Sequence, residues 1–177
     1  MPATSRTARA FALALAGLGV IASTMTALPA AATSGDTQAV TAAATKPRPA
    51  ARRVSTRVLG ARDTALRQRG DSYAYGASGP DRFDCSGLVF YSYRRAGFSV
   101  PRTSSAQAGF THRIAKQDMR AGDLMFFYGS GGVYHAAIFL RWSHGHALMV
   151  HSPGSGQRVR VAVPWTSQWY GGTLRHR

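Results

Sequence analysis

Apolar and small residues recur with the period of a helix in two segments between residues 54 and 96. The first segment, 54–69, is followed by Gly70, and the second begins at Cys85 and is followed by Gly97. Glycine directly after the last periodic residue is a common helix stop. The periodic positions are Val58, Ala61, Ala65 and Leu66 in the first segment and Leu88, Val89, Ser92 and Ala96 in the second. The pattern predicts two helices, the second of about three turns.

The pattern changes after residue 100. Residues 101–107 indicate a turn that enters a short helix capped by Thr103 or Ser104. From Asp118 onward, apolar runs bounded by glycine and turn residues are typical of strands. These runs are 123–128, 133–142, 147–152 and 159–163, and residues 173–175 add a short edge. Helices followed by a meander of strands predict an α+β fold, with N-terminal helices packed on one side of an antiparallel sheet of about five strands.

The amino end is typical of an export signal. Arg6 and Arg9 precede an apolar stretch over 10–22, and Ala30-Ala31-Ala32 offers a cleavage site. A membrane anchor is the alternative, but the stretch is shorter than the roughly 18 residues that a spanning helix needs. We expect a cleaved signal peptide over 1–32 and a secreted protein. Residues 33–53, rich in Ala, Thr and Pro, are expected to be a disordered linker before one folded domain over 54–177.

The chain is strongly basic, with 22 Lys and Arg against 7 Asp and Glu and a formal net charge of +15. Such an excess predicts attraction to polyanions, which outside a cell are anionic wall polymers or lipid headgroups. A solubilising charge without a dedicated partner is the plainer interpretation. Nucleic acid is not an expected partner, because no basic repeat or interleaved aromatic platform is present. We expect a monomer.

Cys85 is the only cysteine, so an exported chain cannot use it for an intramolecular disulfide. Asp84 is a strong N-cap residue and therefore puts Cys85 in the first turn of its helix. There the helix dipole and free backbone N–H groups lower the pKa of a thiol and favour the reactive thiolate. A small buried cysteine without chemistry and a cysteine in an intermolecular disulfide are the alternatives.

Two histidines are expected to meet on the sheet. His135 lies on the strand 133–142 and His151 on the strand 147–152, with a turn centred near residue 144. Antiparallel pairing around that turn puts His151 opposite His135 or one step away, with side chains within about 5–8 Å. If the helix of Cys85 packs across that face, Cys85 is a nucleophile, His135 its general base and His151 the group that orients His135. Two histidines that only share a register are the alternative.

Other chemistries find little support. The few acidic residues are scattered and do not form the carboxylate pair of a glycosidase, and no glycine-rich phosphate loop is present. His144 and His146 are half a metal site at most, because no acidic or thiol ligand is near them. We expect no metal and no organic cofactor. The loop 73–80, with two tyrosines, is expected to line a cleft before the Cys85 helix.

Four ordered motifs together resemble the NlpC/P60 cysteine peptidases. They are Tyr73-x-Tyr75-Gly76 with Phe83-Asp84-Cys85-Ser86-Gly87, Pro101-Arg102-Thr103-Ser104, Gly122-Asp123-Leu124, and His135-Ala136-Ala137 with Val150-His151-Ser152. The resemblance covers roughly residues 57–163. It implies a papain-like α+β fold and a secreted, wall-associated endopeptidase. Its substrate would be the peptide stems of bacterial peptidoglycan, typically cut between D-glutamate and the following diamino acid.

The resemblance also implies roles for single residues. Cys85 matches the nucleophile, His135 the base and His151 the third polar residue. Tyr73 matches a tyrosine that lines the active site, where it can support the oxyanion beside the backbone N–H of Cys85. Asp84 and Ser86 match positions that face the substrate cleft, and Asp84 can also pair with a substrate amine.

Other functions remain open for the same residues. An amidase or an acyl transferase would keep the triad and change the acyl chemistry. A non-catalytic wall-binding module would keep only the fold, although it has no need of all three triad residues. A toxin delivered into competitors is the third alternative.

Overall fold

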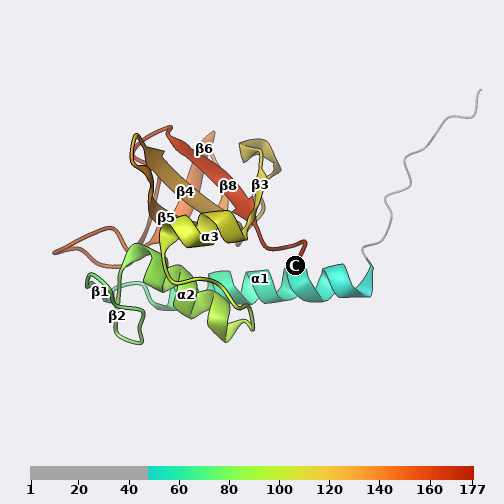
Figure 1. The fold of residues 1–177 in the computed structure, drawn as a ribbon, viewed down its shortest axis with the longest axis horizontal. Coiled ribbons are helices and arrows are strands. Elements are labelled where there is room, and N and C mark those ends of the chain that lie inside the picture. Colours follow the sequence, from blue (N-terminus) through green and yellow to red (C-terminus); the bar gives the residue numbers. More distant parts are fainter. Residues whose placement is uncertain (1–47) are drawn as a thin grey trace, which may run out of the picture. The chain divides into compact units, whose positions relative to one another are not determined.

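The first helix begins earlier than its apolar pattern predicts. The computed structural model describes residues 48–177, so the expected signal peptide over 1–32 and most of the expected linker over 33–53 lie outside the described residues. Helix α1 spans Pro49–Arg67 (Figure 1), so residues 49–53 are helical and not linker. Proline suits the first helical position and the alanines after it favour a helix, although none of them adds to the apolar stripe. Among the described residues, no helix is both long and apolar enough to cross a membrane.

The next two helices begin where their caps predict. Helix α2 (Cys85–Arg95) has Asp84 as its N-cap, whose side chain accepts a hydrogen bond from the backbone N–H of Gly87. Helix α3 (Ser104–Phe110) begins after Thr103, whose hydroxyl accepts from the backbone N–H of Ala106. Each cap satisfies one of the backbone donors that a helix leaves free at its first turn. The caps therefore fix Cys85 as the first residue of α2.

The strands form a six-stranded antiparallel sheet in the order β3-β8-β4-β5-β6-β7. The strands are β3 (His112–Ile114), β4 (Leu124–Gly129), β5 (Gly132–Ser143), β6 (His146–His151), β7 (Arg160–Ala162) and β8 (Trp169–Thr173). Two further short strands, β1 (Ser72–Tyr73) and β2 (Arg82–Phe83), pair in parallel next to α2. The α+β architecture with helices on an antiparallel sheet is confirmed.

The last strand corrects one prediction. Residues 173–175 were expected at an edge of the sheet, but β8 ends at Thr173 and lies between β3 and β4. Gly171 and Gly172 are buried there, and a Cβ on Gly172 would lie 2.4 Å from the Thr111 hydroxyl oxygen. Glycines that admit close neighbours carry no alternating apolar pattern, so the sequence pattern did not show this strand.

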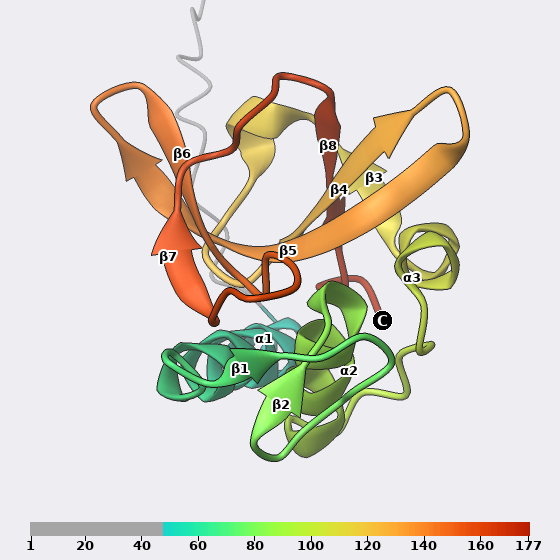
Figure 2. The ribbon, with the colours of Figure 1, turned by 90° about the vertical axis from the view of Figure 1, so that its left-hand side faces the viewer.

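The two faces of the sheet have different covers. Leu88 and Val89 of α2 belong to the core that includes Ala136 and Ile138 of β5, so the helices cover that face. In Figure 2 the helices lie below the curved sheet. The other face carries a second apolar cluster, made of Met119, Met125, Phe127, Ala137, Phe139, Ala147, Met149 and Trp169. Because His135 alternates with Ala136, α2 does not pack across the face of His135 as we expected.

Candidate active site

The thiol of Cys85 lies half-buried at the start of α2. The backbone N–H groups of Cys85, Ser86 and Ala136 lie close enough to lower its pKa. Burial has the larger effect, the negative charge of Asp84 adds to it, and the pKa of the Cys85 thiol is raised. The prediction that the helix terminus lowers the pKa of the Cys85 thiol is therefore wrong, because the net shift is upward. The resting thiol is protonated and needs a base to become a nucleophile.

The two histidines are in direct contact, as the strand pattern predicts. Nε2 of His135 lies 3.0 Å from Nδ1 of His151. Ile138 pairs with Val150, so His151 comes next to Ala137 and diagonally from His135 on the same face. Both side chains are almost completely buried. The strands therefore hold the two imidazoles in one hydrogen-bonded pair.

The environment keeps this pair uncharged. Burial and then the charge of His151 lower the pKa of His135 to about 3, although Asp84 acts in the opposite direction. Burial and then the charge of Arg160 lower the pKa of His151 to about 4. Two neutral imidazoles share one hydrogen bond only if one donates and the other accepts. When His135 donates through Nε2, its Nδ1 is the acceptor that a general base needs.

Two electrostatic effects indicate that the start of α2 lies close to β5. Asp84, which precedes Cys85, lies close enough to His135 to raise its pKa. The N–H of Ala136, which follows His135, acts on the thiol of Cys85. The structure thus brings the predicted nucleophile and the predicted histidine pair to one place, although the helix packs on the opposite face.

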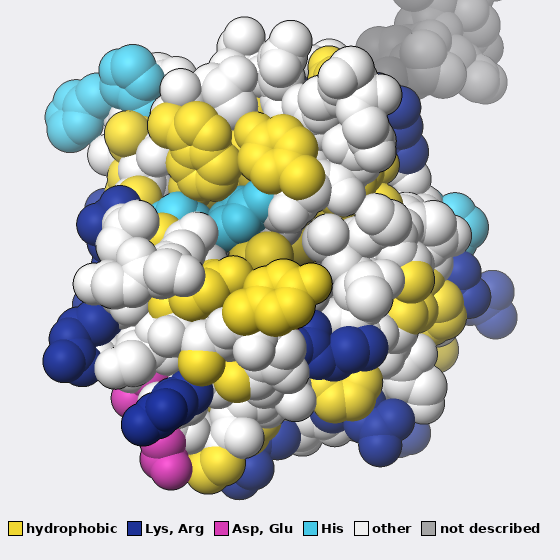
Figure 3. All heavy atoms as spheres, turned by 60° about the vertical axis from the view of Figure 1, so that its left-hand side comes forward, with side chains coloured by type: hydrophobic (Ala, Val, Ile, Leu, Met, Phe, Trp, Pro, Cys, Tyr) yellow, Lys and Arg dark blue, Asp and Glu magenta, His cyan; other side chains and the backbone are white. Residues whose placement is uncertain are grey.

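A cleft of about 440 Å³ opens beside the thiol. Its walls come from the tyrosine loop, the start of α2, the segment before α3 and the start of β5, and they include Tyr73, Cys85, Ser86, Ser104 and Tyr134. Figure 3 shows histidine side chains in a hollow flanked by hydrophobic side chains. A larger depression of about 640 Å³ along the first turns of α1 contains arginines but no nucleophile or base.

Tyr73 lies on this cleft, as predicted. Burial, followed by the charges of Cys85 and Asp84, raises the pKa of its phenol. The hydroxyl is therefore protonated at neutral pH and can donate a hydrogen bond.

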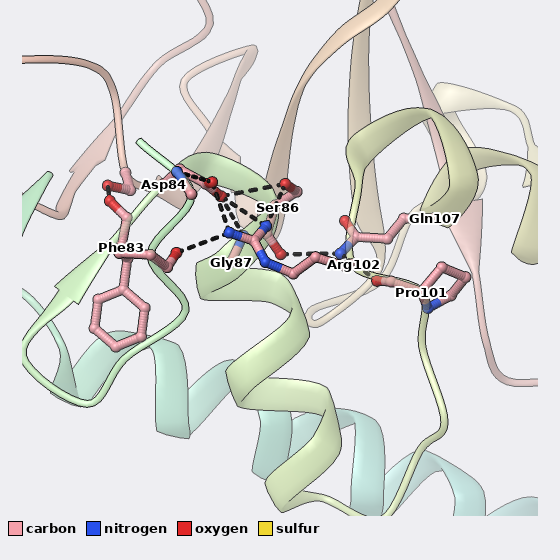
Figure 4. Close-up of polar contacts among 10 residues, drawn as sticks. Phe83, Asp84, Ser86, Gly87, Pro101, Arg102 and Gln107 are labelled. Carbon is pink, nitrogen blue, oxygen red and sulfur yellow. Dashed lines mark hydrogen bonds and ion pairs between the residues drawn. The ribbon is translucent and has the colours of Figure 1, made fainter. Parts of the chain in front are cut away.

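Asp84 and Ser86 also line the cleft, but the carboxylate of Asp84 is already bonded. Arg102 contacts both of its oxygens, with Nη1 at 3.0 Å and Nη2 at 2.7 Å (Figure 4). The backbone N–H groups of Gly87 and Gly76 donate at 2.6 Å and 2.9 Å, and the Ser86 hydroxyl donates at 3.2 Å. A carboxylate with these partners does not fit the expected role of pairing with a substrate amine.

Burial alone would raise the pKa of Asp84, but the Arg102 guanidinium and the backbone donors outweigh it and lower the pKa. The carboxylate is therefore ionised at neutral pH, and its charge is compensated by Arg102.

Arg102 and Gln107 belong to the motif segment that begins at Pro101, but the sequence indicated no role in the site for either residue. Besides Asp84, Arg102 donates to the Ser86 hydroxyl at 3.0 Å and to the carbonyl of Ala77 at 3.1 Å. The amide of Gln107 donates to the carbonyls of Ser86 and Pro101 at 2.9 Å each (Figure 4). These bonds join the tyrosine loop, the start of α2 and the segment before α3. The burial of the Asp84 carboxylate, which calls for a nearby cation, is visible only in the structure.

No metal-binding cluster of three or more His, Cys, Asp or Glu side chains occurs within residues 48–177. His144 and His146 lie at the turn between β5 and β6, and His144 has the positive φ of a tight turn.

Comparisons with known proteins agree with this geometry. A sequence model of the NlpC/P60 family matches residues 70–177. A probable endopeptidase of Corynebacterium glutamicum is 41% identical over 93 residues, which are 52% of this chain and 42% of that protein. The chain thus spans less than half the length of this relative.

Two solved structures of Mycobacterium tuberculosis proteins are also similar. The peptidoglycan hydrolase RipB is 27% identical with a TM-score of 0.59, over 73% of this chain and 72% of RipB. RipD, described as a non-catalytic NlpC/p60 domain protein adapted to peptidoglycan binding, is 29% identical with a TM-score of 0.54, over 67% of this chain and 97% of RipD. Because the family match covers most of the chain and the neighbours share its fold, this chain belongs to the NlpC/P60 family.

Proposed function

We propose that this protein is a cysteine endopeptidase that hydrolyses the peptide stems of bacterial peptidoglycan. The observation that carries the proposal is the neutral His135–His151 pair beside a thiol at the start of α2. The names of the relatives support a hydrolase acting on peptidoglycan. RipD supports the alternative of a binding module, but Cys85, His135 and His151 are all present in this chain.

The chemistry follows from the protonation states. Nδ1 of His135 takes the proton of Cys85 while the sulfur attacks the carbonyl carbon of the scissile amide. The backbone N–H of Cys85 and the hydroxyl of Tyr73 stabilise the oxyanion. When the C–N bond breaks, His135 returns the proton to the leaving amine and a thioester remains. Water that loses a proton to His135 then attacks the thioester, and the thiol is restored when the C–S bond breaks.

We propose the bond between D-glutamate and the following diamino acid as the one cleaved, on the resemblance of the motifs. With Asp84 bonded to Arg102, recognition of a substrate amine falls to other polar groups of the cleft. The hydroxyl group of Ser104 on its wall is one candidate, whereas the hydroxyl group of Ser86 is already bonded to Asp84 and Arg102.

Secretion and retention at the wall are further parts of the proposal. Loss of Arg6 and Arg9 with the expected signal peptide lowers the formal net charge from +15 to +13, and a chain of this charge is expected to bind anionic wall polymers through Coulomb attraction. Retention on isolated walls should then fall steeply between low and high salt, because salt screens exposed charges. Equal retention at both salt concentrations would rule out this mode of targeting.

The deciding experiment compares the wild type and Cys85→Ala on purified peptidoglycan and on isolated muropeptides. Fragments are identified by mass, and new D-glutamyl termini made only by the wild type establish the endopeptidase and its bond. Transfer of the acyl group to an added amine or alcohol, in competition with water, indicates an acyl transferase. Cleavage at the amide between sugar and peptide indicates an amidase. Binding by both proteins without cleavage by either indicates a wall-binding module.

A further inference from the structure

The connection between β7 and β8 crosses the sheet over the histidine pair. In the strand order, β6, β5 and β4 lie between β7 and β8, so residues 163–168 must pass over all three. Figure 2 shows this connection on the side of the sheet away from the helices. Its far end is held by bonds from Lys116 Nζ to the carbonyl of Ser167 at 2.9 Å and from the N–H of Tyr128 to the carbonyl of Gln168 at 3.2 Å.

Trp165, in the middle of this connection, covers both imidazoles. Its ring stacks on Phe127 with centroids 4.4 Å apart and 7° between the planes. The same ring lies 5.1 Å from the His135 ring, nearly perpendicular to it, and 5.7 Å from the His151 ring at 25°. Trp165 is nevertheless 55% exposed. One side of the indole therefore packs on the catalytic pair while much of the rest remains in solvent.

The atoms under this cover have few partners. Nε2 of His151 is buried and makes no hydrogen bond with any group of residues 48–177. His135 uses Nε2 only for its contact with His151. A water molecule at this position would offer both imidazoles another donor and acceptor. The indole ring of Trp165 occupies the outer side of the pair, and its ring carbons form no hydrogen bond with Nε2 of His135 or Nε2 of His151.

On the basis of the function proposed above, we propose that Trp165 is a positioning residue of the active site. Its indole seals the outer side of the His135–His151 contact against water, so that His151 is the sole partner of His135 Nε2. His135 is thereby held in the tautomer whose Nδ1 accepts the proton of Cys85.

The seal has a consequence for pH dependence. The titratable and charged groups around the pair are Asp84 and Cys85 at the start of α2 and Arg160 on β7, besides the two imidazoles themselves. Burial is the largest cause of the low pKa of both histidines. Opening the outer side to water removes part of this burial, so both pKa values should rise toward the ordinary value of about 6.5.

The test compares Trp165→Ala, Trp165→Phe and the wild type by NMR titration of the histidine ring protons and by the pH profile of kcat/KM. Trp142→Ala is the matched control, because Trp142 is 41% exposed on the same sheet and packs on Phe139 and Trp169, not on the histidines. For Trp165→Ala we expect an acidic limb shifted upward and at most about a thirtyfold loss at pH 5, since a histidine of pKa 6.5 is about 3% neutral there. The loss at pH 8 should be small, and Trp165→Phe should restore most of the wild-type profile.

Two results overturn the proposal. One is a Trp165→Ala titration that coincides with the wild type. The other is a loss that is equal at all pH values and confined to KM, which makes Trp165 a substrate contact only. The NMR titration needs no turnover, so a chain that proves inactive on peptidoglycan still tests the seal. Thermal unfolding of each variant distinguishes a local opening from loss of the fold.

Discussion

The proposed nucleophile, Cys85, and the proposed base, His135, are supported by opposite kinds of interaction. At the start of α2, the Arg102 guanidinium donates hydrogen bonds to the Asp84 carboxylate and the Ser86 hydroxyl, and the Ser86 hydroxyl donates to Asp84. The donor–acceptor distances are 2.7–3.2 Å. Around His135 the neighbours are the rings of Phe127, His151 and Trp165, and within residues 48–177 its side chain makes one hydrogen bond, with His151. One half of the site is thus fixed by ionised partners and the other half by aromatic packing.

The difference suits the two tasks. Charge-assisted, bidentate hydrogen bonds fix geometry strongly, which places the backbone donors of α2 around the thiol. Aromatic burial disfavours the charged form of histidine, which keeps a base free to accept a proton at neutral pH. A carboxylate in place of these rings would favour the charged form of His135 and raise its pKa.

Removing either chemical group should have the largest effect. Cys85→Ala and His135→Ala should each lower kcat/KM on muropeptides by about a thousandfold or more, because the two residues act as one unit. The double variant should lose little beyond either single one. Circular dichroism should show an intact fold in all three. Substantial hydrolysis by Cys85→Ala would place the nucleophile elsewhere.

The second test removes the arginine of the polar half of the site and compares the result with the same change in another ion pair. Asp123 and Arg175 form another buried ion pair, at 3.3 Å, with side chains 1% and 8% exposed, away from the cleft. Arg175→Gln should cost about 3 kcal/mol of unfolding free energy and Arg102→Gln about 2 kcal/mol, because the Arg102 side chain is 31% exposed.

Only Arg102→Gln should change the reactivity of Cys85. Without the guanidinium, the negative charge of Asp84 acts on the thiol uncompensated and raises its pKa further. Alkylation by iodoacetamide at neutral pH should therefore slow in Arg102→Gln and remain unchanged in Arg175→Gln. Equal rates in both variants would show that Arg102 acts on the fold alone.

Local sequence signals were enough to predict the start of α2 and the meeting of the histidines. An N-cap residue, a glycine stop and a short β-turn each act within a few residues, and they fixed Asp84, Cys85 and the register that joins His135 to His151. The fold class followed from the same signals.

The features that the sequence did not reveal depend on tertiary structure. The thiol pKa has the opposite sign to our expectation because burial is set by the whole site and not by the helix end. Arg102 meets Asp84 across 18 residues, and nothing in its own segment indicates the pairing. Trp165 reaches the histidines only because β8 lies beside β4, and this strand order arises from pairing distant in the chain.

The third prediction concerns the aromatic half of the site and the pH dependence of the free energy of unfolding. In the unfolded chain a histidine titrates near pH 6.5, whereas His135 and His151 titrate at about 3 and about 4 when folded. Between these values the unfolded state binds more protons, so stability is present above pH 6.5 and is lost as pH falls. Urea unfolding should show that the free energy of unfolding falls by up to about 1.4 kcal/mol per pH unit for each of the two histidines. His151→Gln should roughly halve the slope, and a flat profile for the wild type would contradict the buried neutral pair.

The smallest effect should come from Tyr73, whose phenol lies close enough to Cys85 and Asp84 for both charges to raise its pKa. Its raised pKa keeps the hydroxyl protonated, so Tyr73→Phe removes one oxyanion donor while the backbone N–H of Cys85 remains. We expect a loss of about tenfold in kcat with little change in KM, below the usual cost of removing such a donor. Tyr75→Phe is the comparison variant, because Tyr75 lies in the same loop and lines the same cleft but is 93% exposed, and its kcat should equal that of the wild type. If Tyr73→Phe were also fully active, oxyanion stabilisation would rest on the α2 backbone alone, and the polar half of the site would supply all of it.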